Sequence, residues 1–102
     1  MRIIAKRALV EFCGRLPRLE RKSALAAMIA WHAATEAAGW ANYADVKATF
    51  NTADWVGNGK VVFDIGGNKY RIVGLMGFRS KRVWVLFVGT HDDYDQIDVT
   101  KL

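Results

Sequence analysis

The feature that most limits how this chain can fold is a change in residue pattern about halfway along it. Before residue 50 the sequence is rich in Ala and Leu, which favour helices, and its apolar side chains recur at helical spacing. After residue 60 it is rich in Val, Ile and aromatic residues, which favour strands. Helices first and strands second predict an α+β fold, with N-terminal helices packed on a small antiparallel sheet.

The first half predicts three helices. Apolar residues recur at helical spacing over residues 6–16, and Pro17 ends this helix because the residue before a proline avoids the helical conformation. The same proline suits the start of a second helix over residues 18–38, which Gly39 would follow. A short third helix is expected over residues 43–50. The apolar stripe expected along the second helix is Leu25, Met28, Ile29 and His32.

The second half predicts an antiparallel meander. Residues 60–65 and 69–78 form two β-branched and aromatic runs, and Gly66-Gly67-Asn68 between them is typical of a tight hairpin turn. A third strand is expected over residues 83–90. Its first six residues are continuously apolar, which is typical of a central strand covered on both faces. Residues 2–5 are a candidate for a short opening strand.

Length and composition exclude several classes of protein. With 102 residues, of which 52% are hydrophobic, the chain fits one domain whose core needs neither disulfides nor metal. No apolar run reaches the roughly 20 residues of a membrane span, and no apolar segment typical of a secretory signal follows Met1. The one cysteine, Cys13, cannot form an internal disulfide, which suits a reducing compartment. We therefore expect a cytoplasmic protein that has no membrane partner.

The net charge of +5 is unevenly distributed. Residues 1–22 and residues 69–82 each carry a net +5, whereas residues 23–68 carry −2 and residues 83–102 carry −3. If the fold brings the two basic segments together, they form one positive face that attracts polyanions, chiefly nucleic acid. The alternative is that these side chains simply solvate the surface.

Basic side chains on and just after the predicted strand over residues 69–78 are candidates for phosphate binding. Because side chains alternate along a strand, Lys69 and Arg71 project from the same face of the strand over residues 69–78. The next turn carries Arg79, Lys81 and Arg82. An arginine on a rigid strand suits a phosphate because its guanidinium is planar and always charged. The alternative for each of these residues is a surface ion-pair partner.

The segment after the last predicted strand carries His91 and Tyr94. They are three residues apart, so one helical turn puts both side chains on one side. Histidine exchanges protons near neutral pH, and tyrosine donates hydrogen bonds to anionic oxygens. Beside Arg71 they would make a site for cleaving an RNA phosphodiester, although a histidine after a strand is also typical of a capping or core position. The nearby aspartates lack the loop pattern of a calcium site, so no metal site is expected.

Two other residue types have mainly structural interpretations. Cys13 occupies an apolar position of a predicted helix, which indicates a buried, unreactive thiol. The tryptophans are interpreted mostly as core residues: Trp31, Trp40, Trp55 and Trp84. Among them, Trp55 is the candidate for stacking on an RNA base if it is exposed.

Two motifs occur in order in the second half: Gly-Asn-Lys-Tyr-Arg, which ends at Arg71, and Gly-Thr-His-x-x-Tyr-Asp, which ends at Asp95. Together with Ala-Asp-Trp-Val-Gly over residues 53–57, they resemble the HigB-type mRNA interferase toxins of bacterial type II toxin–antitoxin systems, a RelE-like group. The resemblance spans residues 17–99. It implies a RelE-like toxin domain over residues 1–102, with a fold like that of microbial ribonucleases.

The resemblance also implies an activity, partners and residue roles. It implies cleavage of mRNA on translating ribosomes, without a metal or organic cofactor. It also implies neutralisation by a HigA-type helix-turn-helix antitoxin, and contact with DNA only through the complex with that antitoxin. The implied mechanism is general acid–base catalysis, in which the 2′-hydroxyl attacks the adjacent phosphate. Arg71 would bind that phosphate, His91 would transfer a proton, and Tyr94 would donate a hydrogen bond or act as the acid. The remaining candidates are Arg79 and Lys69, flanking the phosphate, and Lys81 and Arg82, holding the RNA backbone.

One alternative from another class stays open. The same basic face would serve a non-catalytic module that binds RNA, DNA or the antitoxin. The first basic segment, over residues 2–22, lies largely outside the resemblance and is assigned to contact with the ribosome, RNA or antitoxin rather than to chemistry.

Overall fold

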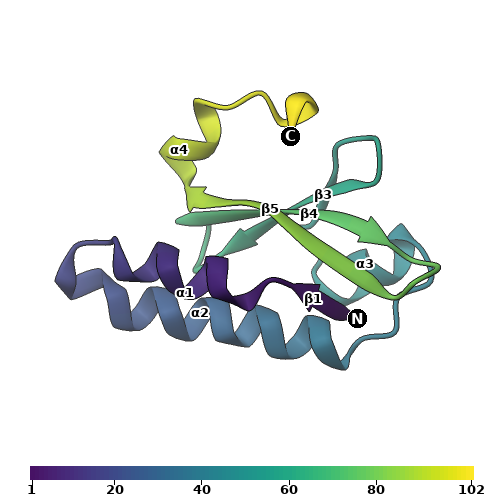
Figure 1. Cartoon of the computed structure of the whole chain (residues 1–102), viewed down its shortest axis with the longest axis horizontal. Coiled ribbons are helices and arrows are strands. Elements are labelled where there is room, and N and C mark those ends of the chain that lie inside the picture. Colours follow the sequence, from purple (N-terminus) through teal and green to yellow (C-terminus); the bar gives the residue numbers. More distant parts are fainter.

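The computed structural model describes all 102 residues as a sheet between two unequal layers (Figure 1). Helices α1 and α2 cover one face of the sheet, and α4 with the C-terminal turn lies on the other. The elements in chain order are β1 (Arg2–Ile4), α1 (Lys6–Gly14), α2 (Arg18–Ala37), α3 (Tyr43–Thr49), β2 (Asp54–Trp55), β3 (Lys60–Ile65), β4 (Tyr70–Gly77), β5 (Arg82–Thr90), α4 (His91–Asp95) and a 3₁₀ turn (Val99–Lys101). The predicted α+β class is confirmed. None of the helices has the length and hydropathy needed to cross a membrane.

The sheet has the order β1-β5-β4-β3-β2. Its centre is the predicted antiparallel meander of β3, β4 and β5. The expectation of a purely antiparallel sheet is wrong, because β1 runs parallel to β5. A hairpin turn forces its two strands to be antiparallel, but β1 and β5 are separated by the rest of the chain, so no turn sets their direction. The two-residue β2, which the sequence pattern did not predict, pairs with β3.

The turn between β3 and β4 is one residue longer than predicted. Ile65 pairs with Tyr70, so the turn comprises residues 66–69 and Lys69 belongs to it rather than to the strand. Gly66, Gly67 and Asn68 all have positive φ angles, of 62°, 64° and 80°. Glycine and asparagine are the residues that adopt this left-handed conformation most readily, which explains this run of residues.

Met28 is buried in the core as expected, but the rest of the expected apolar stripe of α2 is displaced by one position along the helix. The side chains that α2 buries are Ala24, Met28, Trp31 and Thr35. The predicted Leu25, Ile29 and His32 lie on the next stripe, which faces α1, and Ile29 is 45% exposed there. Because alanines fill both stripes, apolar periodicity did not separate them, and the bulk of Trp31 decides which stripe enters the core.

The core centres on Phe63 of β3, which is 1% exposed. Its ring lies 5.2 Å from that of Trp31, 5.6 Å from that of Phe50 and 6.3 Å from that of Trp40. These rings tie α2, the end of α3 and the sheet together. Cys13 is also buried in this core, as predicted, and burial raises the pKa of its thiol.

Strand β5 is not covered on both faces as expected. It lies between β4 and the edge strand β1, and most of its side chains after Val83 remain partly exposed. Two tryptophans likewise do not belong to the core. Trp55 is 42% exposed at the β2 edge, and Trp84 on β5 is partly exposed. A continuous apolar run predicts apolar surroundings but does not show how far a second layer extends over them.

Candidate functional site

The candidate site lies on the sheet face that α1 and α2 do not cover. Residues paired across neighbouring strands point to the same face. Arg71 of β4 pairs with Asp64 of β3 and with Gly89 of β5. The next pair along, Phe63 and Ile72, belongs to the core and points toward the helices. Arg71 therefore projects from the opposite face, where α4 lies (Figure 1).

Arg71 is held firmly by its surroundings. The residue is only 9% exposed, and its Nε lies 3.1 Å from Oδ1 of Asp64. Its Nη1 donates hydrogen bonds to the backbone carbonyls of Asn68 and Tyr70, both at 3.2 Å. These contacts involve Nε and Nη1 and leave Nη2 without a partner. Arg71 projects from one face of β4 as predicted, but its guanidinium is mostly buried and is oriented in advance by its partners.

Local sequence explains where α4 begins. Thr90 caps the helix by accepting a hydrogen bond from the backbone N–H of Asp93, whose carboxylate accepts one from the N–H of Thr90. Gly89 is needed because a Cβ there would lie 2.5 Å from the Phe87 ring and 3.0 Å from the Asp93 Cβ. The backbone N–H of His91 donates to the carbonyl of Lys69, at 2.9 Å. The start of α4 is therefore attached to the β3–β4 turn that also holds Arg71.

His91 is partly exposed at the first turn of α4, with 44% of its side chain accessible. Its Nδ1 lies 3.1 Å from Oδ2 of Asp95, one helical turn further on. A carboxylate at this distance fixes the orientation of the imidazole ring. With Nδ1 facing Asp95, Nε2 is the nitrogen that can exchange a proton with a substrate.

Tyr94 lies between α4 and the sheet, with its ring 6.3 Å from that of Phe87. Burial raises the pKa of the Tyr94 hydroxyl, the Asp54 carboxylate raises it further, and the Arg71 guanidinium opposes these effects. The hydroxyl therefore stays protonated at neutral pH and acts as a donor. Arg71 pairs with Gly89 just before α4, so Arg71 and Tyr94 belong to the same end of this face.

The structure thus brings together four of the seven predicted site residues. Arg71, His91 and Tyr94 gather where β4 begins and β5 ends, and Lys69 adjoins them in the turn, with its side chain exposed. Two supporting residues were missed. A four-residue turn after Ile65 places Asp64 opposite Arg71, so the correct turn length would have revealed this partner. Asp95 was recognisable from its spacing of four residues from His91.

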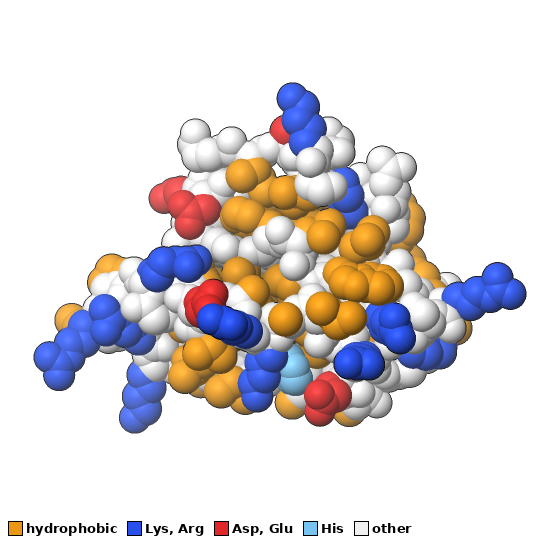
Figure 2. All heavy atoms as spheres, viewed as in Figure 1, with side chains coloured by type: hydrophobic (Ala, Val, Ile, Leu, Met, Phe, Trp, Pro, Cys, Tyr) orange, Lys and Arg blue, Asp and Glu red, His pale blue; other side chains and the backbone are white.

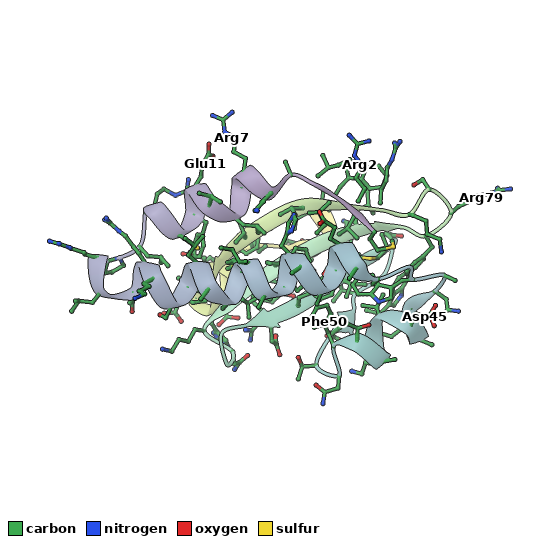
Figure 3. The ribbon with its side chains drawn as sticks, turned by 90° about the horizontal axis from the view of Figure 1, so that it is seen from below. Arg2, Arg7, Glu11, Asp45, Phe50 and Arg79 are labelled. Atoms are coloured by element: carbon green, nitrogen blue, oxygen red, sulfur yellow. The ribbon has the colours of Figure 1, made fainter.

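The other three predicted residues lie at the far end of the sheet. Gly77 pairs with Arg82 and lies six positions along β4 from Arg71, which corresponds to about 20 Å. Arg79 lies in the hairpin beyond it and points away from the molecule (Figure 3). The expectation that Arg79 flanks the phosphate at Arg71 is therefore wrong, because the length of the strand separates them.

Lys81 has a structural task that the sequence pattern did not reveal. Its Nζ donates hydrogen bonds to the carbonyls of Gly39, at 3.1 Å, and Trp40, at 2.9 Å. These contacts attach the β4–β5 hairpin to the segment that follows α2. Two of the three ammonium hydrogens are thus engaged, and the expectation that Lys81 holds the RNA backbone stays a prediction. Arg82 stays exposed.

The two basic segments of the sequence meet at this far end. Arg2 of β1 pairs in register with Arg82 of β5, and the backbone N–H of Arg2 donates to the carbonyl of Lys81, at 2.7 Å. Figure 3 shows Arg2 and Arg79 toward the same end of the molecule. The condition for a shared positive surface is therefore met at this edge of the sheet.

One group of side chains has the composition of a cation site. Ligand atoms of His91, Asp92 and Asp95 lie within 4.8 Å of one another on the first turns of α4. Both aspartates are exposed, and no buried donor adds to the group. We assign no metal site to it, because solvated acidic residues gather in this way on the ends of many helices.

A sheet with helices on one face, and an arginine, a histidine and a tyrosine gathered on the other, defines an α+β protein with a candidate site on its open sheet face. The chain belongs to the HigB_toxin family, the RelE-like toxic component of a toxin–antitoxin system, which matches residues 24–97. The match contains most of α2 and every element from α3 to α4, and hence all the candidate residues. No curated protein matches the chain. The protein is thus the toxin of a toxin–antitoxin pair and has an antitoxin as its partner.

Proposed function

We propose that this toxin is a metal-independent endoribonuclease that cleaves mRNA on the ribosome and thereby inhibits translation. The observation that carries the proposal is the meeting of Arg71, Tyr94 and His91 at one end of the open sheet face. A fixed cation, a protonated hydroxyl and an imidazole are the groups that phosphodiester cleavage needs when no metal takes part.

In the proposed reaction the RNA supplies its own nucleophile. The 2′-oxygen forms a bond to phosphorus while the bond from phosphorus to the 5′-oxygen breaks, giving a cyclic phosphate and a free 5′-hydroxyl. Nε2 of His91 takes the proton of the 2′-hydroxyl, and Tyr94 donates a proton to the departing 5′-oxygen. Nη2 of Arg71 stabilises the negative charge that grows on the phosphoryl oxygens, and its other nitrogens are held in advance by Asp64 and the turn.

The finer details of partners and location also belong to the proposal. The antitoxin is of the HigA type, with a helix-turn-helix domain, and the toxin meets DNA only through their complex. The toxin acts in the cytoplasm, where its substrate is translated. The family match supports an antitoxin in general, and the sequence motifs support its type.

The test compares the wild type with His91→Gln and Tyr94→Phe in a translating extract, with a chelator that binds transition metals but leaves the Mg²⁺ that ribosomes need. We expect the wild type to fragment mRNA and each variant to lose about 100-fold in cleavage rate. The matched control is His32→Gln, because His32 is the other histidine and lies on α2, on the far side of the sheet. It should cleave like the wild type.

Two outcomes would contradict the proposal. If both site variants fragment mRNA as fast as the wild type, Tyr94 and His91 take no part in the reaction. If the wild type stops translation while mRNA stays intact, the protein is the non-catalytic binding module. The ion pair of Arg71 with Asp64 favours this non-catalytic module, because it engages the Arg71 guanidinium in a structural contact.

A further inference from the structure

The far end of the open sheet face carries an aromatic side chain that the proposed chemistry does not use. Trp84 of β5 pairs with Leu75 of β4 and with Ile4 of β1, so all three side chains point to the face that carries Arg71. Each of the three is partly exposed. Figure 2 shows apolar side chains gathered in the middle of the molecule with Lys and Arg side chains around them.

A glycine makes room for the indole of Trp84. A Cβ on Gly77 would lie 2.7 Å from Cζ3 and 3.1 Å from Cη2 of Trp84. The φ angle of Gly77 is not positive, so the backbone conformation does not require glycine there. The six-membered ring therefore lies against bare backbone of β4, which supports it from below and leaves part of the indole open to solvent.

Two unpaired cations lie beside this indole. Arg2 and Arg82 are paired in register on neighbouring strands and are two residues from Ile4 and Trp84, so they share the same face. Both are exposed, and neither takes part in any of the four ion pairs of the structure. Like charges on neighbouring strands repel each other, and a bound anion relieves that repulsion.

We propose that Trp84, Arg2 and Arg82 form a second subsite for single-stranded RNA. A base stacks on the indole of Trp84, and the phosphates next to that base bind the two guanidinium groups. The base must be unpaired, because a base in a duplex offers no free ring face for stacking. This subsite rests on the proposed function and deepens it by giving the path of the substrate.

The path follows from the position of the two sites. Both lie on one face of the same sheet, and about 20 Å of β4 separates Arg71 from the pair of Gly77 and Arg82. A strand of RNA a few nucleotides long is long enough to bridge that distance. An acidic segment of the antitoxin would also meet two arginines, but it would not need the exposed ring of Trp84, so RNA is the occupant that the residues favour.

The test measures binding without cleavage. The probe is a single-stranded RNA of about ten nucleotides with 2′-O-methyl groups, which cannot supply the nucleophile and is long enough to span the face. Binding to the purified toxin is followed by fluorescence anisotropy of the labelled RNA over a series of salt concentrations. Thermal unfolding of every variant is recorded beside it.

Two substitutions address the stacking. Trp84→Leu should weaken binding about 10-fold, and Trp84→Phe, which keeps an aromatic ring, should weaken it less. Arg82→Gln should weaken binding and lower the slope of affinity against salt by about one unit. Its matched control is Arg15→Gln, the same charge change at an exposed position after α1, which should have little effect.

The outcomes separate this inference from the proposed nuclease activity. Unchanged binding by Trp84→Leu and Arg82→Gln would overturn the subsite, whether or not the wild type cleaves mRNA. The subsite would also be overturned if Trp55→Leu lost RNA affinity while Trp84→Leu kept it. The same holds if the Trp84 and Arg82 variants bind RNA normally but no longer bind the antitoxin. If the wild type fails to cleave but binds RNA through Trp84, the subsite stands and the proposed reaction falls.

Discussion

Replacement of Arg71 by alanine tests the interpretation of this residue, because the structure gives it a stabilising role as well as a chemical one. The change removes the ion pair with Asp64 and the hydrogen bonds to the carbonyls of Asn68 and Tyr70. The variant should therefore lose stability and cleavage together, and loss of toxicity alone would not show that Arg71 binds the phosphate.

The expected loss of stability follows from the exposure of the partners. The Asp64 side chain is 30% exposed, so the ion pair is worth about 1 kcal/mol, close to the value for surface pairs. The two bonds from a charged donor add about 1–2 kcal/mol, because the exposed turn lets water reach the carbonyl of Asn68. A total of about 2–3 kcal/mol lowers the melting temperature of a domain this size by roughly 10–20 °C.

The contributions of the ion pair and of the hydrogen bonds to stability can be measured by thermal and urea unfolding. The variants to compare are Arg71→Ala, Asp64→Asn and the double variant. Asp64→Asn alone should cost about 1 kcal/mol, and the double-mutant cycle should give a coupling of about 1 kcal/mol. Arg71→Lys keeps the charge but not the planar fork, so it should stay folded and still cleave poorly. If Arg71→Ala melts within about 2 °C of the wild type, the stabilising role derived from the contacts is refuted.

Three further predictions concern the site and the core. Burial raises the pKa of Tyr94 above its unfolded value near 10, so the stability that the protonated hydroxyl contributes is present below about pH 10 and is lost as the pH rises further. Between about pH 9 and pH 11, the unfolding free energy measured with urea should therefore fall less for Tyr94→Phe than for the wild type. An equal fall in the two proteins would contradict this. Burial also raises the pKa of Cys13, so a thiol-specific disulfide reagent should react with it only after unfolding, and rapid reaction in native buffer would show the thiol to be accessible. Phe63→Ala should cost about 3–5 kcal/mol in unfolding free energy because three aromatic rings lose their shared contact, and a cost below about 1 kcal/mol would mean that the core collapses around the gap.

The motif Gly-Thr-His-x-x-Tyr-Asp combines positioning and chemistry. Gly89 allows α4 to approach β5, and Thr90 caps the helix, so neither needs to touch a substrate. His91 and Tyr94 then occupy one side of the helix that these two residues place. Substitution of Gly89 or Thr90 therefore bears on the position of the site rather than on the reaction itself.

Much of the fold was predictable because its signals are local. Apolar periodicity located α1 to α3, the run of glycines and asparagine located the β3–β4 turn, and alternation placed Arg71 on one face of β4. Where the pattern was ambiguous, the prediction went wrong: alanines blurred the buried stripe of α2, and Lys69 was assigned to the strand instead of the turn.

The residues of the candidate site were partly predictable for the same reason. Arg71, His91 and Tyr94 were recognisable by type and spacing, and the fold brings them together. Residue type and spacing did not show that Arg79 lies away from these three residues. The number of residues between two positions gives their distance in space only when the strand between them is extended. That geometry puts about 20 Å between the two ends of β4.

By itself, the sequence determined the kinds of element, their order, the meander and the family, since each follows from neighbouring residues or from short motifs. Only the tertiary structure decided that β1 lies parallel beside β5 and that Asp64 holds Arg71. It also decided that Lys81 binds the segment after α2, and that Trp84 lies on the open face beside one arginine from each basic segment. These contacts join residues far apart in the chain or across a turn whose length had to be known. Their formation depends on which surfaces pack together, and local periodicity carries no information about that.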